Sequence, residues 1–151
     1  MAVTIEKNIL TVSAGIIIHQ VNTQGKMGAG LALQIKNKWP QVFEAYSELC
    51  NSVPISTLLL GNIQTVEVAN RLLVCNMFAQ DKYGREGLYT SYQHMELAFK
   101  KIATLPKRVS CCPLFYLPEN IGCGLAGGDW QVVYSLIQTN LPNAIICKLP
   151  D

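Results

Sequence analysis

A run of three isoleucines, Ile16 to Ile18, constrains the fold of this chain more than any other feature. It lies in a strand-like segment that extends from Gly15 to Val21. A strand with one face in water alternates apolar and polar residues, whereas a continuous β-branched run is typical of a strand buried on both faces. The sequence therefore predicts a sheet that helices cover on both sides.

Segments typical of strands and of helices alternate along the rest of the chain. Apolar residues recur at helical spacing before and after Pro40, between Tyr92 and Ile102, and from Trp130 onward. Further strands are predicted at residues 3–5, 58–66, 72–78, 109–117 and 144–149, and the short gap at 67–71 indicates a hairpin. With 151 residues and no repeat or linker, the chain is expected to form one domain over residues 1–151. The predicted fold class is α/β, a three-layer α/β/α sandwich with a mixed central sheet.

The composition excludes several classes of protein. Half of the residues are hydrophobic and only 15% are charged, which excludes intrinsic disorder. The net charge of +2 argues against a nucleic-acid partner, and no apolar run reaches the roughly 18 to 20 residues that cross a membrane. The six cysteines form no Cys-x-x-Cys pair, so neither a zinc site nor a disulfide framework is indicated. We expect free thiols and, without an export leader, a cytoplasmic protein.

Two glycine-rich turns lie between a predicted strand and a predicted helix. The first glycine loop, residues 22–31, has the sequence Asn-Thr-Gln-Gly-Lys-Met-Gly-Ala-Gly-Leu. The second glycine loop, residues 121–130, has the sequence Ile-Gly-Cys-Gly-Leu-Ala-Gly-Gly-Asp-Trp. Glycines let the backbone approach a ligand closely, and N–H groups at a helix start bind phosphate groups. At the carboxyl ends of strands in one sheet, the two loops are expected to flank a single ligand site.

Two common phosphate-binding motifs do not account for these loops. Gly122, Gly124 and Gly127 match the G-x-G-x-x-G pattern of dinucleotide-binding folds. That pattern requires an acidic residue about 20 positions further on, and here none follows there before the terminal Asp151. Neither loop has the Gly-Lys-Ser/Thr sequence of a P-loop. A nicotinamide cofactor is therefore not expected.

The order of these loops resembles that of the macrodomain family. The similar stretches are residues 19–40 and 121–130, together with Lys7-Asn8-Ile9-Leu10 after the first predicted strand, and the order of elements fits over essentially the whole chain. Residues 27–30 and 121–125 look most like the branch that holds the ADP-ribose-1''-phosphate phosphatases and the terminal ADP-ribose protein glycohydrolases. The resemblance implies a macrodomain-like fold and an ADP-ribose pocket. Because the sequence shows no cluster of metal-ligating residues, we expect neither a metal nor a cofactor.

The resemblance also implies a role for particular residues. Asn8 and Ile9 would lie at the adenine end, Asn22 would bind the distal ribose, and the glycines of the second loop would donate to the diphosphate. Asn22 is also typical of a turn cap, and this alternative stays open. The implied ligand-binding residues are Asn8, Ile9, Asn22, Gly25, Lys26, Met27, Gly28, Ala29, Gly30, Leu31, Gly122, Cys123, Gly124, Leu125, Ala126 and Gly127.

Three residues are candidate catalytic groups by the same resemblance. His19 would donate a proton to the departing ribose oxygen, and Asp129 or Asp81 would orient or deprotonate water. A structural alternative stands beside two of these roles, since His19 ends a buried strand and Asp129 precedes a helix as an N-cap would. Asp81 follows a strand, where its side chain can either face the pocket or point away from it, and both alternatives stay open.

This chain differs from the glycohydrolases of this branch at two positions that bear on their activity. In the glycohydrolases an aspartate follows the Gly-Cys-Gly-Leu run, where this chain has Ala126, and their catalytic lysine falls near Asp81. Lys82 is adjacent, but strand alternation turns it away from that face. We therefore expect a phosphatase acting on ADP-ribose-1''-phosphate, with ADP-ribose or that phosphate as the small-molecule partner. A non-catalytic ADP-ribose reader and a hydrolase that removes ADP-ribose from macromolecules are the alternatives, and the oligomeric state stays open.

Overall fold

The computed structural model describes residues 1–83, 87–105 and 114–150. Within them, six strands form one sheet in the order β1-β6-β5-β2-β4-β3. β3 is antiparallel to β4, and every other pair of neighbours is parallel, which confirms the predicted mixed sheet. The strands are β1 (Val3–Glu6), β2 (Gly15–Asn22), β3 (Ile63–Ala69), β4 (Leu72–Gln80), β5 (Phe115–Pro118) and β6 (Ile145–Lys148).

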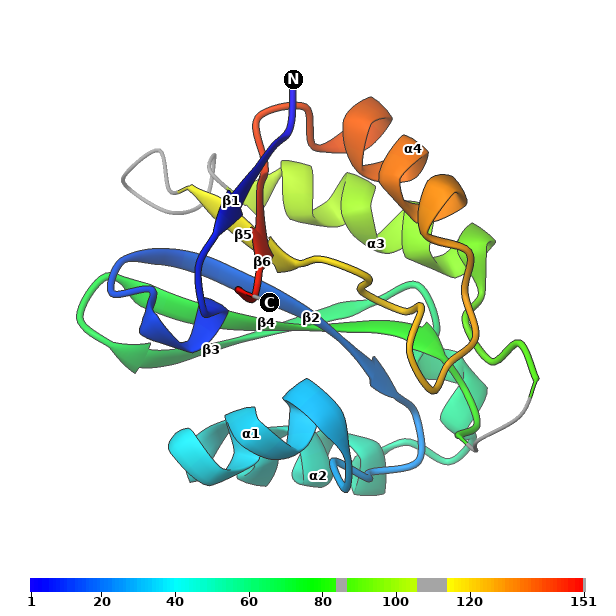
Figure 1. The fold of residues 1–151 in the computed structure, drawn as a ribbon. Coiled ribbons are helices and arrows are strands. Elements are labelled where there is room, and N and C mark those ends of the chain that lie inside the picture. Colours follow the sequence, from blue (N-terminus) through cyan, green and yellow to red (C-terminus); the bar gives the residue numbers. More distant parts are fainter. Residues whose placement is uncertain (84–86, 106–113, 151) are drawn as a thin grey trace.

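Helices cover the two faces of the sheet and complete the predicted three layers (Figure 1). α1 (Gly30–Lys38) and α2 (Pro40–Ser52) lie on one face, and α3 (Tyr92–Ala103) and α4 (Trp130–Asn140) lie on the other. Two short 3-10 helices, η1 (Ile9–Thr11) and η2 (Ser56–Leu59), follow β1 and α2. Pro40 ends α1 and begins α2, because a proline disfavours helix in the residue before it and fits the first turn of the next helix.

The isoleucine run of β2 joins the two halves of the core. Ile16 and Ile18 pack in the cluster formed with α3 and α4, whereas Ile17 and Val21 pack in the cluster formed with α1 and α2. All three isoleucines are fully buried. Each contributes roughly 1.5 to 3 kcal/mol of burial free energy, so β2 is the strand around which both helical layers assemble.

Two predicted strands differ from the structure. The segment predicted at residues 58–66 begins as η2 and becomes a strand only at Ile63, because Gly61 has a φ of +82° that interrupts an extended chain. The segment predicted at residues 109–117 contributes β5 from Phe115, and its first part lies outside the described residues. The hairpin is confirmed, and its turn places Arg71 at a φ of +68°.

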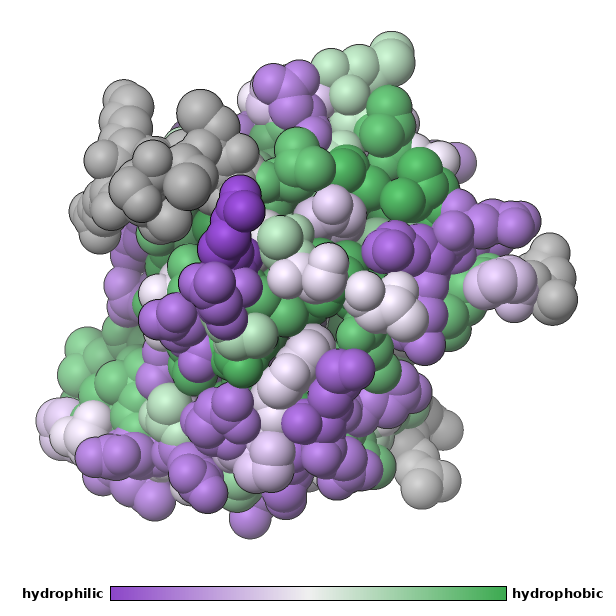
Figure 2. Space-filling view, turned by 90° about the vertical axis from the view of Figure 1, so that its left-hand side faces the viewer, coloured by the Kyte–Doolittle hydropathy of each residue, from purple (hydrophilic) through white to green (hydrophobic). Residues whose placement is uncertain are grey.

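The surface at one end of the sheet is of mixed polarity. β1 is an edge strand and all four of its residues are exposed, including the hydrophobic Val3 and Ile5. Figure 2 shows hydrophilic and hydrophobic side chains side by side on the left-hand face of the molecule. In the described part of the chain, no helix has both the length and the apolar character needed to span a bilayer. The described cysteines, Cys50, Cys75, Cys123 and Cys147, are free thiols, whereas Cys111 and Cys112 lie outside the described residues.

Candidate functional site at the two glycine loops

The two glycine loops leave the same edge of the sheet. β2 and β5 are adjacent parallel strands, with Ile16 opposite Phe115 and Ile17 opposite Tyr116. The first glycine loop follows the carboxyl end of β2, and the second follows β5 after a turn (Figure 1). The topology thus brings together the two segments that the sequence singled out, at the edge where open α/β sheets bind their ligands.

A third segment, at residues 87–90, fixes the second glycine loop to the sheet. The Thr90 hydroxyl donates to the Gly122 carbonyl over 2.6 Å and accepts from Gln20 Nε2 of β2 over 2.9 Å. The Tyr89 N–H donates to the Ala126 carbonyl over 2.7 Å. The loop is therefore held at both ends, and its middle residues are left free of these contacts.

Gly127 permits this close approach. A Cβ atom added there would lie 2.2 Å from the Gly87 carbonyl oxygen, and the φ of Gly127 is +77°, a conformation that favours glycine. By contrast, a Cβ added at Gly28 or Gly124 would meet nothing within 4 Å. The glycine motif therefore combines positions that the fold requires with positions that leave open space beside the backbone.

Several backbone N–H groups of the two glycine loops have no hydrogen-bond partner among the described residues. These include the N–H groups of Gly28 and Ala29 in the first loop and of Gly124, Leu125 and Ala126 in the second. Ala29 is the N-cap of α1 and supplies no side-chain cap, so the first N–H groups of this helix are also uncapped. Such groups favour an anion or a hydroxyl oxygen as their acceptor.

Asn22 shapes the first glycine loop in the way that a turn cap does. Its Oδ1 accepts from the Gln24 N–H over 2.9 Å and from the Lys26 N–H over 3.4 Å, and its Nδ2 donates to the Lys26 carbonyl over 2.9 Å. Asn22 is only 8% exposed. The structure thus supports the capping alternative for Asn22, and one Nδ2 hydrogen is left for a ligand.

The hydroxyl of Tyr46, on α2, anchors the same loop. Sequence reasoning missed this role. Its buried hydroxyl lies 2.7 Å from both the carbonyl and the Oδ1 oxygens of Asn22, and it accepts from the Lys26 N–H over 3.1 Å. Burial raises the pKa of Tyr46, so the phenol stays neutral and donates. Its ring stacks on Phe78 with centroids 5.9 Å apart. The only sequence signal was a tyrosine on the buried face of a helix, where a hydroxyl requires a partner.

His19 lies buried in the core of the protein. It is 2% exposed, and its Nε2 is 2.6 Å from Asn76 Oδ1. Asn76 Nδ2 donates to Gln64 Oε1 over 3.0 Å, and Gln64 Nε2 donates to the Ala45 carbonyl of α2 over 3.0 Å. Burial lowers the pKa of His19 to about 4, so the ring is neutral. The structure therefore gives His19 the place of a core histidine, which is the structural alternative that its position in a buried strand predicted.

Asp81 lies at the end of β4, beside the first glycine loop. Its Oδ1 accepts from the Thr23 hydroxyl, from Gln24 Nε2 over 3.1 Å and from the Ser56 hydroxyl over 3.3 Å. The side chain is half-buried. The structure thus brings Asp81 to the predicted site, where its bonded oxygen is occupied by protein donors.

Asp129 is the N-cap of α4 at the end of the second glycine loop. Its Oδ1 accepts from the Gln131 N–H over 2.9 Å, and its own N–H donates to the Tyr92 hydroxyl over 2.9 Å. The residue is exposed, and its second carboxylate oxygen has no partner among the described residues. The capping role predicted for Asp129 is confirmed, and an oxygen remains for chemistry.

The remaining predicted ligand residues fall into two groups. Ile9, Met27 and Ala126 are buried by the protein itself, so their side chains belong to the core or to loop packing. Asn8 is exposed and caps η1 by accepting from the Leu10 N–H over 3.0 Å. The other exposed or half-buried members are Gly25, Lys26, Gly28, Ala29, Gly30, Leu31, Gly122, Cys123, Gly124, Leu125 and Gly127.

Cys123 is a half-buried member of the second glycine loop. Burial and the Asp129 carboxylate raise the pKa of its thiol to about 11, so this loop cysteine is protonated near neutral pH.

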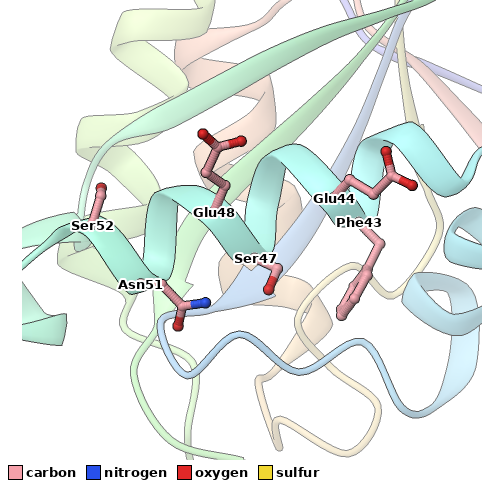
Figure 3. Close-up of a pocket in the computed structure, with 6 residues that line it drawn as sticks. All are labelled: Phe43, Glu44, Ser47, Glu48, Asn51 and Ser52. Carbon is pink, nitrogen blue, oxygen red and sulfur yellow. The ribbon is translucent and has the colours of Figure 1, made fainter.

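A shallow hollow on the surface belongs to a different part of the molecule. It is lined by Phe43, Glu44, Ser47, Glu48, Asn51 and Ser52, which all come from α2 (Figure 3). Because a single helix lines it and neither glycine loop contributes a residue, it does not offer the converging groups of a binding site. The glycine loops remain the candidate site.

Known proteins with related sequences act on ADP-ribose compounds. No family model matches the chain. An ADP-ribose 1''-phosphate phosphatase of Lodderomyces elongisporus is 27% identical over 120 residues, which are 77% of this chain and 74% of that protein. A DNA ADP-ribosyl glycohydrolase of Mycobacterium tuberculosis is 23% identical over 126 residues, 83% of this chain. The chain spans only about a third of that longer relative, 34% of its length.

Solved structures share the fold over the whole chain. A Bacteroides thetaiotaomicron protein of unknown function is 28% identical with a TM-score of 0.86. The match covers 99% of this chain and 98% of that protein's chain. A macrodomain protein of Streptomyces coelicolor is 24% identical with a TM-score of 0.80 and full coverage of both chains. The macrodomain of Thermus aquaticus DarG is 23% identical with a TM-score of 0.79, and covers 100% of this chain and 99% of its own. The fold class and the family resemblance predicted from the sequence are therefore confirmed.

Proposed function

Because the chain has the macrodomain fold, we propose that its two glycine loops bind ADP-ribose or a derivative of it. The observation that carries this proposal is the set of backbone N–H groups in both loops that find no partner within residues 1–83, 87–105 and 114–150, in loops where a Cβ atom added at Gly28 or Gly124 would meet open space. Two negatively charged phosphate groups and several ribose hydroxyls are the acceptors that such donors require.

The two loops divide the ligand between them in this proposal. The N–H groups of Gly124, Leu125 and Ala126 donate to the diphosphate. The first glycine loop, with the uncapped start of α1, surrounds the distal ribose, and the free hydrogen of Asn22 Nδ2 reaches one of its hydroxyls. Asn8 caps η1 at the carboxyl end of β1, the same edge of the parallel strands, and faces the adenine.

Relatives support this class of ligand. One structural neighbour, Thermosipho africanus DarTG, was solved in complex with ADP-ribose, and it matches this chain with a TM-score of 0.76 at 20% identity. The curated relatives include a phosphatase and glycohydrolases of ADP-ribose compounds. They support a hydrolase that acts on a derivative of ADP-ribose.

We infer that the reaction is hydrolysis of the phosphate ester of ADP-ribose-1''-phosphate. Asp129 takes a proton from a water molecule through its free carboxylate oxygen, and the water oxygen forms the new bond to phosphorus. The bond between phosphorus and the 1''-oxygen breaks, and the departing oxygen takes a proton from solvent. Ala126 supports this choice over the glycohydrolase reaction, because it replaces the aspartate that those enzymes have at this position.

One observation favours a second function, a non-catalytic reader of ADP-ribose. The burial of His19 removes the proton donor that the sequence resemblance implied for the phosphatase. Without a general acid, a protein with the same loops binds the product and leaves the ester intact.

A phosphorus NMR time course with ADP-ribose-1''-phosphate tests both functions. The phosphatase predicts loss of the monoester signal, growth of inorganic phosphate and an unchanged diphosphate. Diphosphate signals that broaden without turnover indicate the reader. Spectra that stay unchanged over a range of protein concentrations contradict ADP-ribose binding by these loops.

A further inference from the structure

We propose that Asp81 is a positioning residue, which holds the first glycine loop in its ligand-binding conformation by linking it to η2. The expected effect on ligand binding rests on the proposed function. The link between the first glycine loop and η2 rests on the contacts of Asp81. A single carboxylate oxygen receives donors from two separate segments, the loop after β2 and the 3-10 helix after α2.

The contacts of Asp81 form a compact cluster. Its Oδ1 accepts from the hydroxyl of Thr23, from Gln24 Nε2 over 3.1 Å and from the hydroxyl of Ser56 over 3.3 Å. The backbone of Asp81 adds to the cluster, since its carbonyl accepts from the Thr23 N–H over 3.3 Å. Thr23 is 2% exposed, so its bonds to Asp81 are shielded from solvent, whereas Gln24 is exposed and Ser56 is half-buried. Hydrogen bonds to a charged acceptor are stronger than neutral ones.

The cluster complements the contact that Tyr46 makes on the other side of the loop. Tyr46 fixes Asn22 and Lys26, and Asp81 fixes the intervening Thr23 and Gln24. Gly25 lies between these anchors with a φ of +78°, a conformation that favours glycine. With Asp81 in place, the loop needs little further ordering when a ligand arrives, and ordering is a large part of the cost of binding.

This role differs from that of a ligand-binding or catalytic carboxylate in one measurable way. Ser56 lies outside both glycine loops, and its hydroxyl contacts Asp81 and Gln24. If Asp81 acts by holding the loop, then loss of the Ser56 hydroxyl weakens ligand binding, and it does so only while the Asp81 carboxylate is present. If Asp81 acts on the ligand alone, the two substitutions have independent effects.

Titration calorimetry with ADP-ribose tests the coupling in a double-mutant cycle. We expect Asp81→Ala to weaken binding about tenfold and Ser56→Ala about threefold, with the double variant no weaker than Asp81→Ala. Asp81→Asn keeps the acceptor oxygen and is expected to restore part of the affinity. Ser52→Ala is the matched control, because in the described part of the chain the Ser52 hydroxyl bonds only to the Leu49 carbonyl of its own helix. Effects of Asp81→Ala and Ser56→Ala that multiply in the double variant would overturn the proposal.

Hydrogen exchange without ligand separates this inference from the proposed function. The N–H groups of Thr23, Gln24 and Lys26 are bonded in the loop, and Asp81→Ala is expected to make them exchange about tenfold faster while those of α4 keep their rates. Unchanged exchange at these amides refutes the positioning role of Asp81, whatever ligand the protein binds. If the wild type fails to bind ADP-ribose but Asp81→Ala still accelerates exchange, the proposed function is wrong and the positioning role of Asp81 is supported.

Turnover of ADP-ribose-1''-phosphate supplies a further readout. Asp81→Asn is expected to raise KM about threefold with kcat unchanged, because it loosens the loop without touching the reacting atoms. A large fall in kcat with KM unchanged would instead place Asp81 at the reacting phosphate and overturn its positioning role.

Discussion

His19 of β2 and Asn76 of β4 are opposite each other in the sheet, and His19 Nε2 donates to Asn76 Oδ1 over 2.6 Å. The direction follows from the next bond, because the Asn76 amide uses its Nδ2 to donate to Gln64. His19 is therefore the neutral tautomer with its proton on Nε2, and the buried Nδ1 has no partner among the described residues. A ring in this state contributes to stability through packing and one strong hydrogen bond, and it resists protonation.

The first prediction is that His19 makes the protein sensitive to acid. Burial lowers its pKa from the usual 6.5 to about 4, so between these values the unfolded chain binds a proton that the folded chain does not. The stability is therefore fully present above pH 6.5 and is lost as the pH falls towards 4, by about 3 kcal/mol in all. Urea unfolding at pH 7.5, 5.5 and 4.5 measures this loss.

Two variants separate His19 from the other titrating groups. His19→Gln keeps a side-chain donor and is expected to remove most of the loss between pH 7.5 and 4.5. His94→Gln, at the other histidine of the chain, is expected to keep it. Equal pH profiles for wild type and His19→Gln would contradict the assignment.

The second prediction concerns the Tyr46 hydroxyl. Tyr46→Phe leaves the Asn22 carbonyl and the Lys26 N–H without their buried partner, and is expected to lower the free energy of unfolding by about 1 to 3 kcal/mol. ADP-ribose affinity is expected to fall as well, since the first glycine loop loses a support. Tyr134→Phe is the control, because that hydroxyl accepts a single bond from Gln138 on α4. A Tyr46→Phe variant as stable as Tyr134→Phe would show that the hydroxyl does not anchor the loop.

The third prediction contrasts two glycines of the second glycine loop. Gly127→Ala places a methyl group against the Gly87 carbonyl at a positive φ, and is expected to destabilise the fold by roughly 2 kcal/mol or more. Gly124→Ala places its methyl group in open space, so the midpoint of thermal unfolding is expected to change little while ADP-ribose binding weakens at least tenfold. Thermal unfolding and calorimetry measure the two effects. Full affinity in Gly124→Ala would argue that the ligand does not approach this loop.

The fourth prediction separates the two roles of Asp129. Asp129→Asn keeps an N-cap oxygen but removes the carboxylate, so it is expected to preserve stability while phosphatase turnover falls at least a hundredfold. Asp129→Ala removes both and is expected to cost about 1 kcal/mol of stability in addition. Phosphate release and urea unfolding are the two measurements. Undiminished turnover in Asp129→Asn would exclude Asp129 as the base.

Local sequence patterns predicted most of the fold. The isoleucine run indicated a sheet covered on both faces, Pro40 marked the border between two helices, and the gap at residues 67–71 indicated the hairpin of β3 and β4. The start of β3 was misplaced, because the three leucines at 58–60 have strand-like composition but precede a glycine at φ +82°. A backbone angle of this kind depends on packing that no short window of sequence contains.

Local patterns were enough to predict most helices and strands and the two glycine loops, because hydrophobic period, proline and glycine act over a few neighbouring residues. The roles of the polar side chains depend instead on tertiary contacts. Asn76, the partner of His19, lies 57 residues away in the chain, and Thr23, one partner of Asp81, lies 58 residues away. Tyr46 and Asn22 are separated by 24 residues. Such bonds form only after the sheet and helices have assembled. They assign His19 to the core, Tyr46 to the support of the first glycine loop, and Asp81 to its side.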